Sequence, residues 1–204
     1  IAHLNRGTAL VALYRHEPAL ASYERAIALA PDFADAHLSR GNALSDLTRY
    51  EVALASFERA VALEPDHAVA QFALAQGRLQ QGDFARGREG FEWRWKVEGF
   101  DETRPSDYPQ PLWRGTEALH GRTILLHAEQ GLGDTLQFVR YARLVQALGA
   151  SVVLECPPAL ARLLASCAGI DRLIAQGDEL PPFDVHAPLL SLPRLMQTTL
   201  ETIP

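Results

Sequence analysis

The chain has 204 residues, which is enough for one large domain or two small ones. Apolar residues make up 48% and charged residues 22%, as in ordinary globular proteins. The net charge of -6 argues against a general nucleic-acid binder, because phosphate contacts need clustered lysines and arginines. The sequence contains no run of about 18 apolar residues, so we expect no membrane span.

The chain begins at Ile1, inside a helical pattern, and shows no basic-then-apolar export signal at its start. We therefore expect the true N-terminus to lie upstream. Cys156 and Cys167 are too few for a disulfide framework, and they form no CxxC pair of the kind that binds zinc. We expect two free thiols, no metal site and a location in the reducing cytoplasm.

The first half of the sequence repeats itself at an offset of 34 residues. Residues 5–10 (NRGTAL) return as 39–44 (SRGNAL), and residues 19–26 (ALASYERA) return as 53–60 (ALASFERA). A third, weaker copy follows, with Phe84 aligned under Tyr50 and Phe91 under Phe57. A fixed period of this length is typical of stacked helix pairs.

The pattern resembles the tetratricopeptide repeat (TPR) family, whose signature places small residues where two helices meet and an aromatic ring in the gap. The matching residues of the first copy are Gly7, Ala19, Tyr23, Ala26 and Pro31, and those of the second are Gly41, Ala53, Phe57, Ala60 and Pro65. The third copy departs from this pattern at Arg78 and Arg94. The resemblance implies an α-solenoid of about three helix pairs over residues 1–97, with further repeats before Ile1.

In such arrays the first helix of each pair lines a concave side, and the resemblance implies that this groove holds a polypeptide partner. Helical spacing places Asn5, Thr8, Ser39, Asn42 and Asp46 near that side. In similar repeats an asparagine ladder grips the backbone of an extended peptide. Asn5 occupies the ladder position, whereas the second copy has Ser39 there. The alternative is that these are ordinary solvated residues on a helix face.

The periodic pattern breaks over residues 98–118, where Gly99, Pro105, Pro109 and Pro111 indicate a connector. We expect Trp113 to anchor it. After the connector, short apolar runs alternate with helical patterns over residues 119–204. We expect strands at 123–127, 151–155, 172–174 and 183–186, and helices at 135–148 and 158–165. This alternation predicts an α/β Rossmann-like half domain with a short parallel sheet.

In parallel sheets of this kind, ligands bind beyond the carboxyl ends of the strands. His127 and Glu129 follow the first expected strand, Glu155 ends the second, and His186 ends the fourth. If the first and fourth strands are neighbours, His127 and His186 face the same crevice. Both could equally be structural histidines, and nothing in their spacing demands a metal ion.

The segment Gly131-Leu132-Gly133-Asp134, expected to form a turn after the first strand, supports two enzymatic interpretations. The first is a dinucleotide-binding oxidoreductase, because Glu155 follows Gly133 by 22 residues. Against it, Leu136 replaces the third glycine of that fingerprint. Asp134 at the start of a helix would also repel a pyrophosphate.

The second interpretation rests on residues 127–141, which resemble the opening loop of heptosyltransferase-like glycosyltransferases of the two-lobed (GT-B) fold. Repeats followed by such a lobe are also similar in order to the O-GlcNAc transferase family. The resemblance implies that Asp134 is a general base, made more basic by the like charge of Glu129. It also implies that a sugar or glycan acceptor is bound near this base. The residues implied in acceptor binding are Gly131, Gly133, His127, Glu129 and His186.

The resemblance further implies a nucleotide-sugar donor, bound by a second lobe that we expect after Pro204. The present chain would then be the acceptor-side lobe, inactive alone and without a cofactor of its own. Two alternatives remain open. Asp134 would otherwise serve only to stabilise a helix N-terminus, and the chain as a whole would be a protein-binding scaffold without chemistry.

Overall fold

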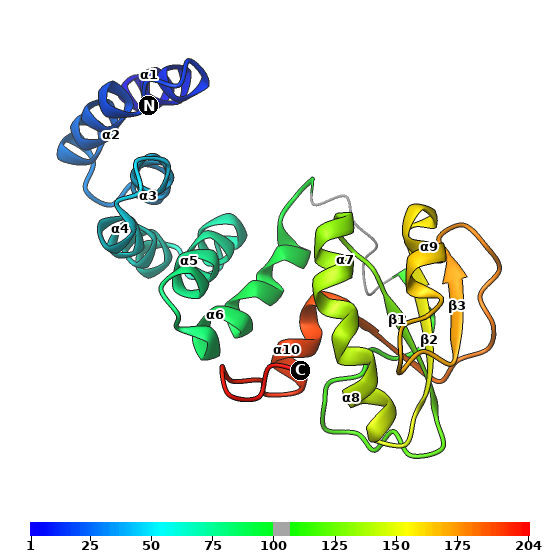
Figure 1. Cartoon of the computed structure of the whole chain (residues 1–204). Coiled ribbons are helices and arrows are strands. Elements are labelled where there is room, and N and C mark those ends of the chain that lie inside the picture. The colour runs from blue at the N-terminus through cyan, green and yellow to red at the C-terminus, as the bar shows by residue number, and fades with distance from the viewer. Residues whose placement is uncertain (100–106) are drawn as a thin grey trace. The chain divides into compact units, whose positions relative to one another are not determined.

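The computed structural model describes residues 1–99 and 107–204, so Pro105 of the expected connector lies outside the described residues. The chain divides into two compact units, residues 1–100 and 101–204. The helices and strands of each unit can be followed by colour in Figure 1. Among the helices of the described ranges, none has the length and apolar character needed to cross a membrane.

The helical unit contains three consecutive helix pairs, as the 34-residue period predicts. The pairs are α1 (Ala2–Ala12) with α2 (His16–Leu29), α3 (Ala34–Asp46) with α4 (Tyr50–Leu63), and α5 (Ala68–Gln80) with α6 (Phe84–Phe91). A short 3-10 helix, η1 (Glu92–Lys96), follows. Each helix packs on the next, and α1 also contacts α3, which in turn contacts α5. The expected α-solenoid is confirmed.

The glycines of the repeat let the two helices of a pair approach closely. A Cβ atom added at Gly7 would overlap the ring of Tyr23, and one added at Gly41 would overlap the ring of Phe57. Both rings are buried, at 3% exposure each. The repeated glycine and aromatic residue therefore form one packing unit, because the ring fills the space that the missing side chain leaves.

The third pair ends differently from the first two. Helix α6 stops at Phe91, and Arg94 of η1 is fully buried. The guanidinium of Arg94 lies 4.1 Å from the centre of the Trp95 ring and 3.0 Å from Oε1 of Glu92. Arg94 occupies the position of Ala26 and Ala60 in the first two copies. Its carboxylate and aromatic partners stabilise the charge of the buried guanidinium at this position.

The α/β unit is built on a parallel four-stranded sheet with the order β3-β2-β1-β4. The strands are β1 (Thr123–His127), β2 (Ser151–Cys156), β3 (Arg172–Ala175) and β4 (Val185–Pro188). The first three match their expected positions. The fourth begins two residues later than expected because Asp184 precedes the strand, where its carboxylate accepts a hydrogen bond from the Thr123 amide. His186 therefore lies within β4, opposite Leu125, and does not end the strand.

The helices of this unit are α7 (Leu132–Phe138), α8 (Ala142–Ala147), α9 (Pro158–Leu164) and α10 (Leu192–Leu195). Two 3-10 turns, η3 (Val139–Tyr141) and η4 (Leu189–Ser191), precede α8 and α10. The single helix expected over 135–148 is thus interrupted by η3 and begins earlier, at Leu132. Gly131 is the N-cap, so Gly133 and Asp134 belong to the first turn of α7 and not to a loop.

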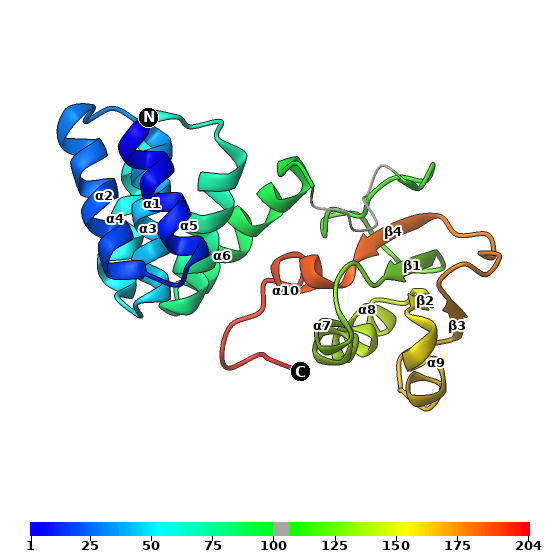
Figure 2. The ribbon, with the colours of Figure 1, turned by 90° about the horizontal axis from the view of Figure 1, so that it is seen from above.

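The two faces of the sheet are covered in different ways. Ile124, Leu126, Val152 and Leu154 point into the larger core, which the helices and the buried Trp113 complete. In Figure 2, α7, α8 and α9 all lie on one side of the strands. The opposite face, which carries Leu125, Val153 and Ile174, packs against Tyr108, Leu180 and Phe183. Among the residues that the structure describes, non-helical segments therefore cover this second face.

Part of the expected connector belongs to this sheet. Leu112 forms a parallel bridge with His186, and the Trp113 amide donates a 2.8 Å hydrogen bond to the His186 carbonyl. Trp113 is 2% exposed and its indole N–H donates to the Glu117 carbonyl, so the predicted anchor is confirmed. Cys156 and Cys167 are free thiols, one buried and one partly buried.

Candidate functional site

The first candidate site is a surface on the odd-numbered helices of the repeat unit. Because α1 contacts α3 and α3 contacts α5, these helices lie side by side along one face. Residues at positions i, i+4, i+7 and i+11 of a helix share one stripe. We call the combined stripes the inner surface. It consists of Asn5, Thr8 and Ala12 on α1, of Asp35, Ser39, Asn42 and Asp46 on α3, and of Val69, Ala73, Gln76 and Gln80 on α5.

The predicted groove residues all fall on the inner surface. Asn5, Asn42 and Asp46 are exposed, as is Thr8, whereas Ser39 is partly buried. The 34-residue period brings equivalent side chains into rows across the three helices. One row is Thr8, Asn42 and Gln76. The sequence alone did not single out Asp35, Gln76 or Gln80 as groove residues. The repeat period could have identified the two glutamines, because Gln76 lies 34 residues after Asn42 and Gln80 lies 34 residues after Asp46.

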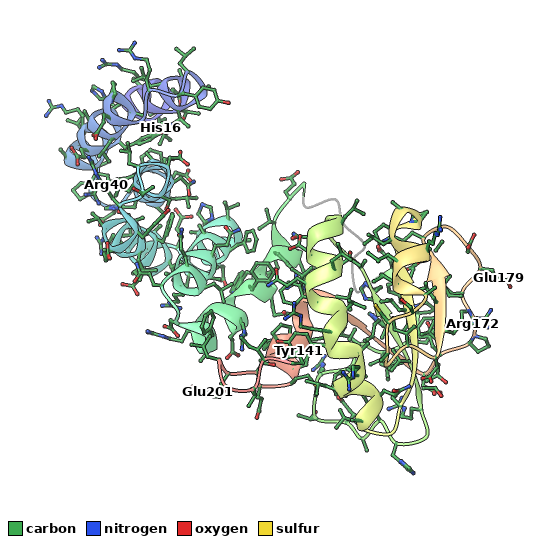
Figure 3. The ribbon with its side chains drawn as sticks, viewed as in Figure 1. His16, Arg40, Tyr141, Arg172, Glu179 and Glu201 are labelled. Atoms are coloured by element: carbon green, nitrogen blue, oxygen red, sulfur yellow. The ribbon has the colours of Figure 1, made fainter. Side chains whose placement is uncertain are left out.

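A histidine lies beside each of the two carboxylates of the inner surface. The ring of His16, labelled in Figure 3, lies 3.1 Å from Oδ2 of Asp46. The ring of His67 lies 3.0 Å from Oδ1 of Asp35. About half of each carboxylate side chain stays exposed, 46% for Asp46 and 54% for Asp35. Both carboxylates are therefore accessible to a partner, and the hydrogen bond with His67 orients Asp35.

The second candidate site lies at the carboxyl end of the parallel sheet, where the predicted residues separate into two groups. Gly131 and Gly133 are exposed, and Asp134 is partly exposed in the first turn of α7. A Cβ atom at either glycine would meet no atom within 4 Å, so neither glycine is needed for packing. This end of α7 is open to an approaching molecule.

The other predicted residues lie in the interior. His127 is 0% exposed, His186 1% and Glu129 1%. Nε2 of His127 lies 3.2 Å from Nδ1 of His186, so the two histidines do share one face of neighbouring strands, as expected for adjacent first and fourth strands. Oε1 of Glu129 accepts a 3.1 Å hydrogen bond from the Leu190 amide.

Tyr108 covers the histidine pair. Its ring centre lies 4.7 Å from that of His127 and 4.8 Å from that of His186, and its hydroxyl donates to Glu155. Burial lowers the pKa of His186, which favours the neutral ring. Burial and the hydrogen bond to Glu155 raise the pKa of the Tyr108 hydroxyl, so the phenol stays protonated. Within residues 1–99 and 107–204, no three potential ligands are grouped so that they could hold a metal ion.

Comparisons with known proteins concern the helical unit. Residues 7–48 match the family described as TPR repeat, and residues 38–92 match the family described as tetratricopeptide repeat. No curated protein matches the chain.

Several solved structures are similar to part of the chain. The second TPR domain of Spaghetti (RPAP3), bound to the HSP90 peptide SRMEEVD, is 23% identical, with 48% of this chain and 90% of that chain covered and a TM-score of 0.46. The Sgt2 TPR domain from Aspergillus fumigatus is 24% identical, with 48% and 65% covered and a TM-score of 0.45. The TPR2B domain of yeast Sti1, in a complex with pHsp70, is 20% identical, with 47% and 79% covered and a TM-score of 0.43. The repeats at residues 7–92 of this chain are tetratricopeptide repeats.

Proposed function

We propose that the helical unit binds an extended polypeptide along its inner surface. The observation that carries this proposal is the row of Thr8, Asn42 and Gln76, three exposed hydrogen-bonding side chains at equivalent positions of consecutive repeats. The side-chain amides of Asn42 and Gln76 both donate and accept, and the Thr8 hydroxyl, which donates to the Leu4 carbonyl, can still accept. Such a row can pair with the backbone of an extended chain. The similar domains of Spaghetti and yeast Sti1 are complexes with HSP90 and pHsp70 peptides, which is consistent with such a role.

The test is a selection of binders from a randomised peptide library on the full chain, followed by affinity measurements with the enriched peptides. We expect the double variant Asn42→Ala/Gln76→Ala to weaken binding roughly tenfold or more, because each lost hydrogen bond contributes about 0.5–1.5 kcal/mol. Gln137→Ala is the matched control, since Gln137 is an exposed amide on α7 of the other unit. Enriched peptides that bind the double variant as tightly as the native chain would contradict the proposal.

A second candidate function concerns the α/β unit, as the acceptor-side lobe of a glycosyltransferase. It is favoured by the position of Asp134, partly exposed in the first turn of α7 beside two glycines with open space around them. A carboxylate there could take the proton of an acceptor hydroxyl as that hydroxyl attacks the anomeric carbon of a donor sugar. The buried His127, Glu129 and His186 would act only through the residues packed on them.

This candidate is tested on the full-length protein by screening nucleotide-sugars for turnover. We expect Asp134→Asn to reduce turnover by a factor of about 10²–10⁴, the usual contribution of a general base. Asp178→Asn, at an exposed aspartate in the turn after β3, is the control. Unchanged turnover in Asp134→Asn would remove this residue from the mechanism. No turnover with any donor would leave peptide binding as the function of the chain.

A further inference from the structure

We propose that the inner surface selects polypeptide segments that carry net positive charge, an inference that rests on the binding function proposed above. Among the residues of the inner surface, Asp35 and Asp46 are charged and the others are apolar or uncharged polar. Both aspartates lie on α3, the central one of the three odd-numbered helices. A segment bound along the Thr8–Asn42–Gln76 row would cross α3 at Asn42, between the two exposed carboxylates.

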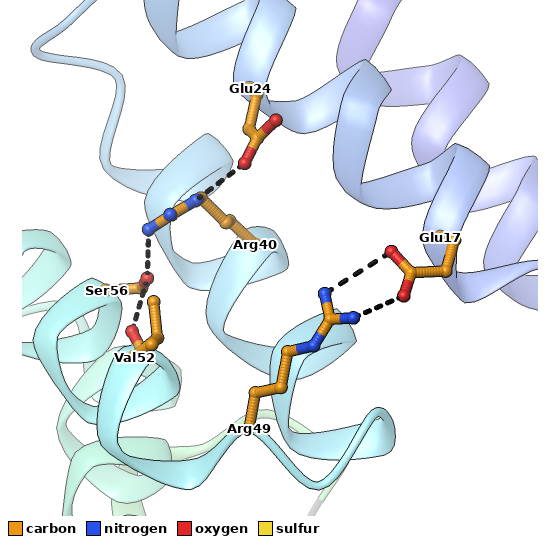
Figure 4. Close-up of polar contacts among 6 residues, drawn as sticks. All are labelled: Glu17, Glu24, Arg40, Arg49, Val52 and Ser56. Atoms are coloured by element: carbon orange, nitrogen blue, oxygen red, sulfur yellow. Dashed lines mark hydrogen bonds and ion pairs between the residues drawn. The ribbon is translucent and has the colours of Figure 1, made fainter.

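Four arginines of the repeats, Arg40, Arg49, Arg59 and Arg78, do not offset these carboxylates, because they pair with acidic residues elsewhere. Figure 4 shows Arg40 between Glu24 of α2 and Ser56 of α4, and Arg49 paired with Glu17. Arg59 pairs with Asp32 at 3.0 Å, and Arg78 with Glu58 at 3.6 Å. These pairs join an even-numbered helix, or the turn beside one, to a neighbouring helix. The arginines named here are thus directed away from the inner surface.

Arg6 is the exposed arginine of α1, and its position follows from the same repeat. It is equivalent to Arg40, which points toward the even-numbered helices α2 and α4. Arg6 also lies one residue beyond Asn5, which places it about 100° around the helix from the inner surface. It is therefore poorly placed to neutralise a peptide bound there.

The geometry of the carboxylates strengthens the charge preference. Nε2 of His67 is hydrogen-bonded to Oδ1 of Asp35, so a lysine or arginine of the partner meets one carboxylate that the protein already orients. Asp46 lies beside His16, with Nδ1 of that ring 3.1 Å from Oδ2 of Asp46. A charge-assisted hydrogen bond of this kind is stronger than a neutral one. A glutamate- or aspartate-rich segment would meet two like charges, and the residues of the inner surface include no lysine or arginine. The Thr8–Asn42–Gln76 row would then bind the backbone of the partner, and the two aspartates of α3 would select the charge of its side chains.

The test uses the peptide selection on the full chain and measures the net charge of the enriched peptides. Only peptides that lose affinity in Asn42→Ala/Gln76→Ala are scored, because these bind the inner surface. We expect them to be more basic than the starting library. The variant Asp35→Asn/Asp46→Asn should weaken their binding by a factor of about 2–30 at low salt, since each exposed ion pair contributes a factor of about 1.4–5. The loss should shrink at high salt, which screens exposed charges.

The control is Glu51→Gln/Glu64→Gln, which removes the same charge from α4 and the residue that follows it, away from the inner surface. We expect it to leave the affinity unchanged. Inner-surface peptides that are neutral or acidic, or that bind Asp35→Asn/Asp46→Asn undiminished, would overturn the charge preference and leave the binding function standing. If no enriched peptide depends on Asn42 and Gln76, the binding function itself fails, and the charge preference fails with it.

Discussion

The hydroxyl of Tyr108 donates a 2.7 Å hydrogen bond to Oε2 of Glu155, a carboxylate 8% exposed near the end of β2. The same tyrosine ring lies against the buried pair His127 and His186 and 6.1 Å from the ring of Phe183. One side chain from a non-helical segment thus covers three polar groups on the face of the sheet opposite α7, α8 and α9. Those groups are held inside the protein by this contact and are not presented to solvent.

We predict that Tyr108→Phe destabilises the α/β unit by about 1–3 kcal/mol, because it leaves the nearly buried Glu155 carboxylate without this donor. The ring itself, and its packing on the histidines, is retained. Hydrogen exchange of the β2 amides measures the change within this unit alone. Tyr14→Phe is the control, since Tyr14 is 87% exposed and its hydroxyl should be replaceable without effect. Equal protection in both variants would show that the hydrogen bond contributes nothing.

The stability of the α/β unit should fall as the pH drops below about 6.5. Burial lowers the pKa of His186, and a hydrogen bond with the Gln110 backbone only partly opposes this. Just below pH 6.5, His186 binds a proton in the unfolded chain but stays neutral in the folded protein. A falling pH therefore favours unfolding. The loss is at most about 1.4 kcal/mol per pH unit for one group. The facing groups are His127, the Tyr108 ring and, through its hydroxyl, Glu155.

Denaturant unfolding between pH 5 and 8 measures this effect. The variant His186→Gln should be less stable at neutral pH but should lose less stability on acidification. His37→Gln is the control, because it also removes one histidine from the chain but at a different place, on α3, where His37 is hydrogen-bonded to the Pro31 carbonyl. If the pH dependence of His186→Gln matched that of the native chain, the acid sensitivity would have to arise elsewhere.

The sequence predicts the repeat architecture well because each repeat is a local unit. Gly7 and Tyr23 lie within one helix pair, and their spacing recurs at Gly41 and Phe57, so one pattern specifies both contacts. The first three strands are equally local, since each is a short apolar run between turn residues. The rows of side chains on the inner surface can also be predicted from the sequence, because Gln76 lies one repeat length after Asn42.

Other features depend on contacts that no local pattern encodes. Tyr108 and Glu155 are 47 positions apart, and nothing near Tyr108 indicates that it covers a sheet. For that reason the sequence predicts that His127 and His186 face a crevice, whereas the two histidines are buried beneath the Tyr108 ring. The sequence places the start of α7 too late, because Gly131 and Gly133 are typical of a turn. In the structure Gly133 lies within the helix, and neither glycine has a backbone conformation in the left-handed region.

Gly41→Ala should destabilise the helical unit by about 1–3 kcal/mol, because the added methyl group overlaps the buried ring of Phe57. Gly77→Ala is a matched control on α5. There a Cβ would lie 3.2 Å from a methyl group of Leu54, which can move, and alanine favours the helix over glycine. Denaturant unfolding followed by hydrogen exchange of the α3 and α4 amides measures both. If the two variants behave alike, the close approach of the α3–α4 pair does not depend on Gly41.

The ion pair between Arg49 and Glu17 connects two successive repeats, and Nη1 of Arg49 lies 3.3 Å from Oε2 of Glu17. Both side chains are about half exposed, at 47% and 57%. We therefore expect Arg49→Gln to lower the stability of the helical unit by no more than about 1 kcal/mol, and less at high salt. A double-mutant cycle with Glu17→Gln isolates the coupling between the two groups. A coupling well above that value, unchanged by salt, would mean that the stacking of these repeats depends on paired charges as well as on apolar packing between neighbouring repeats.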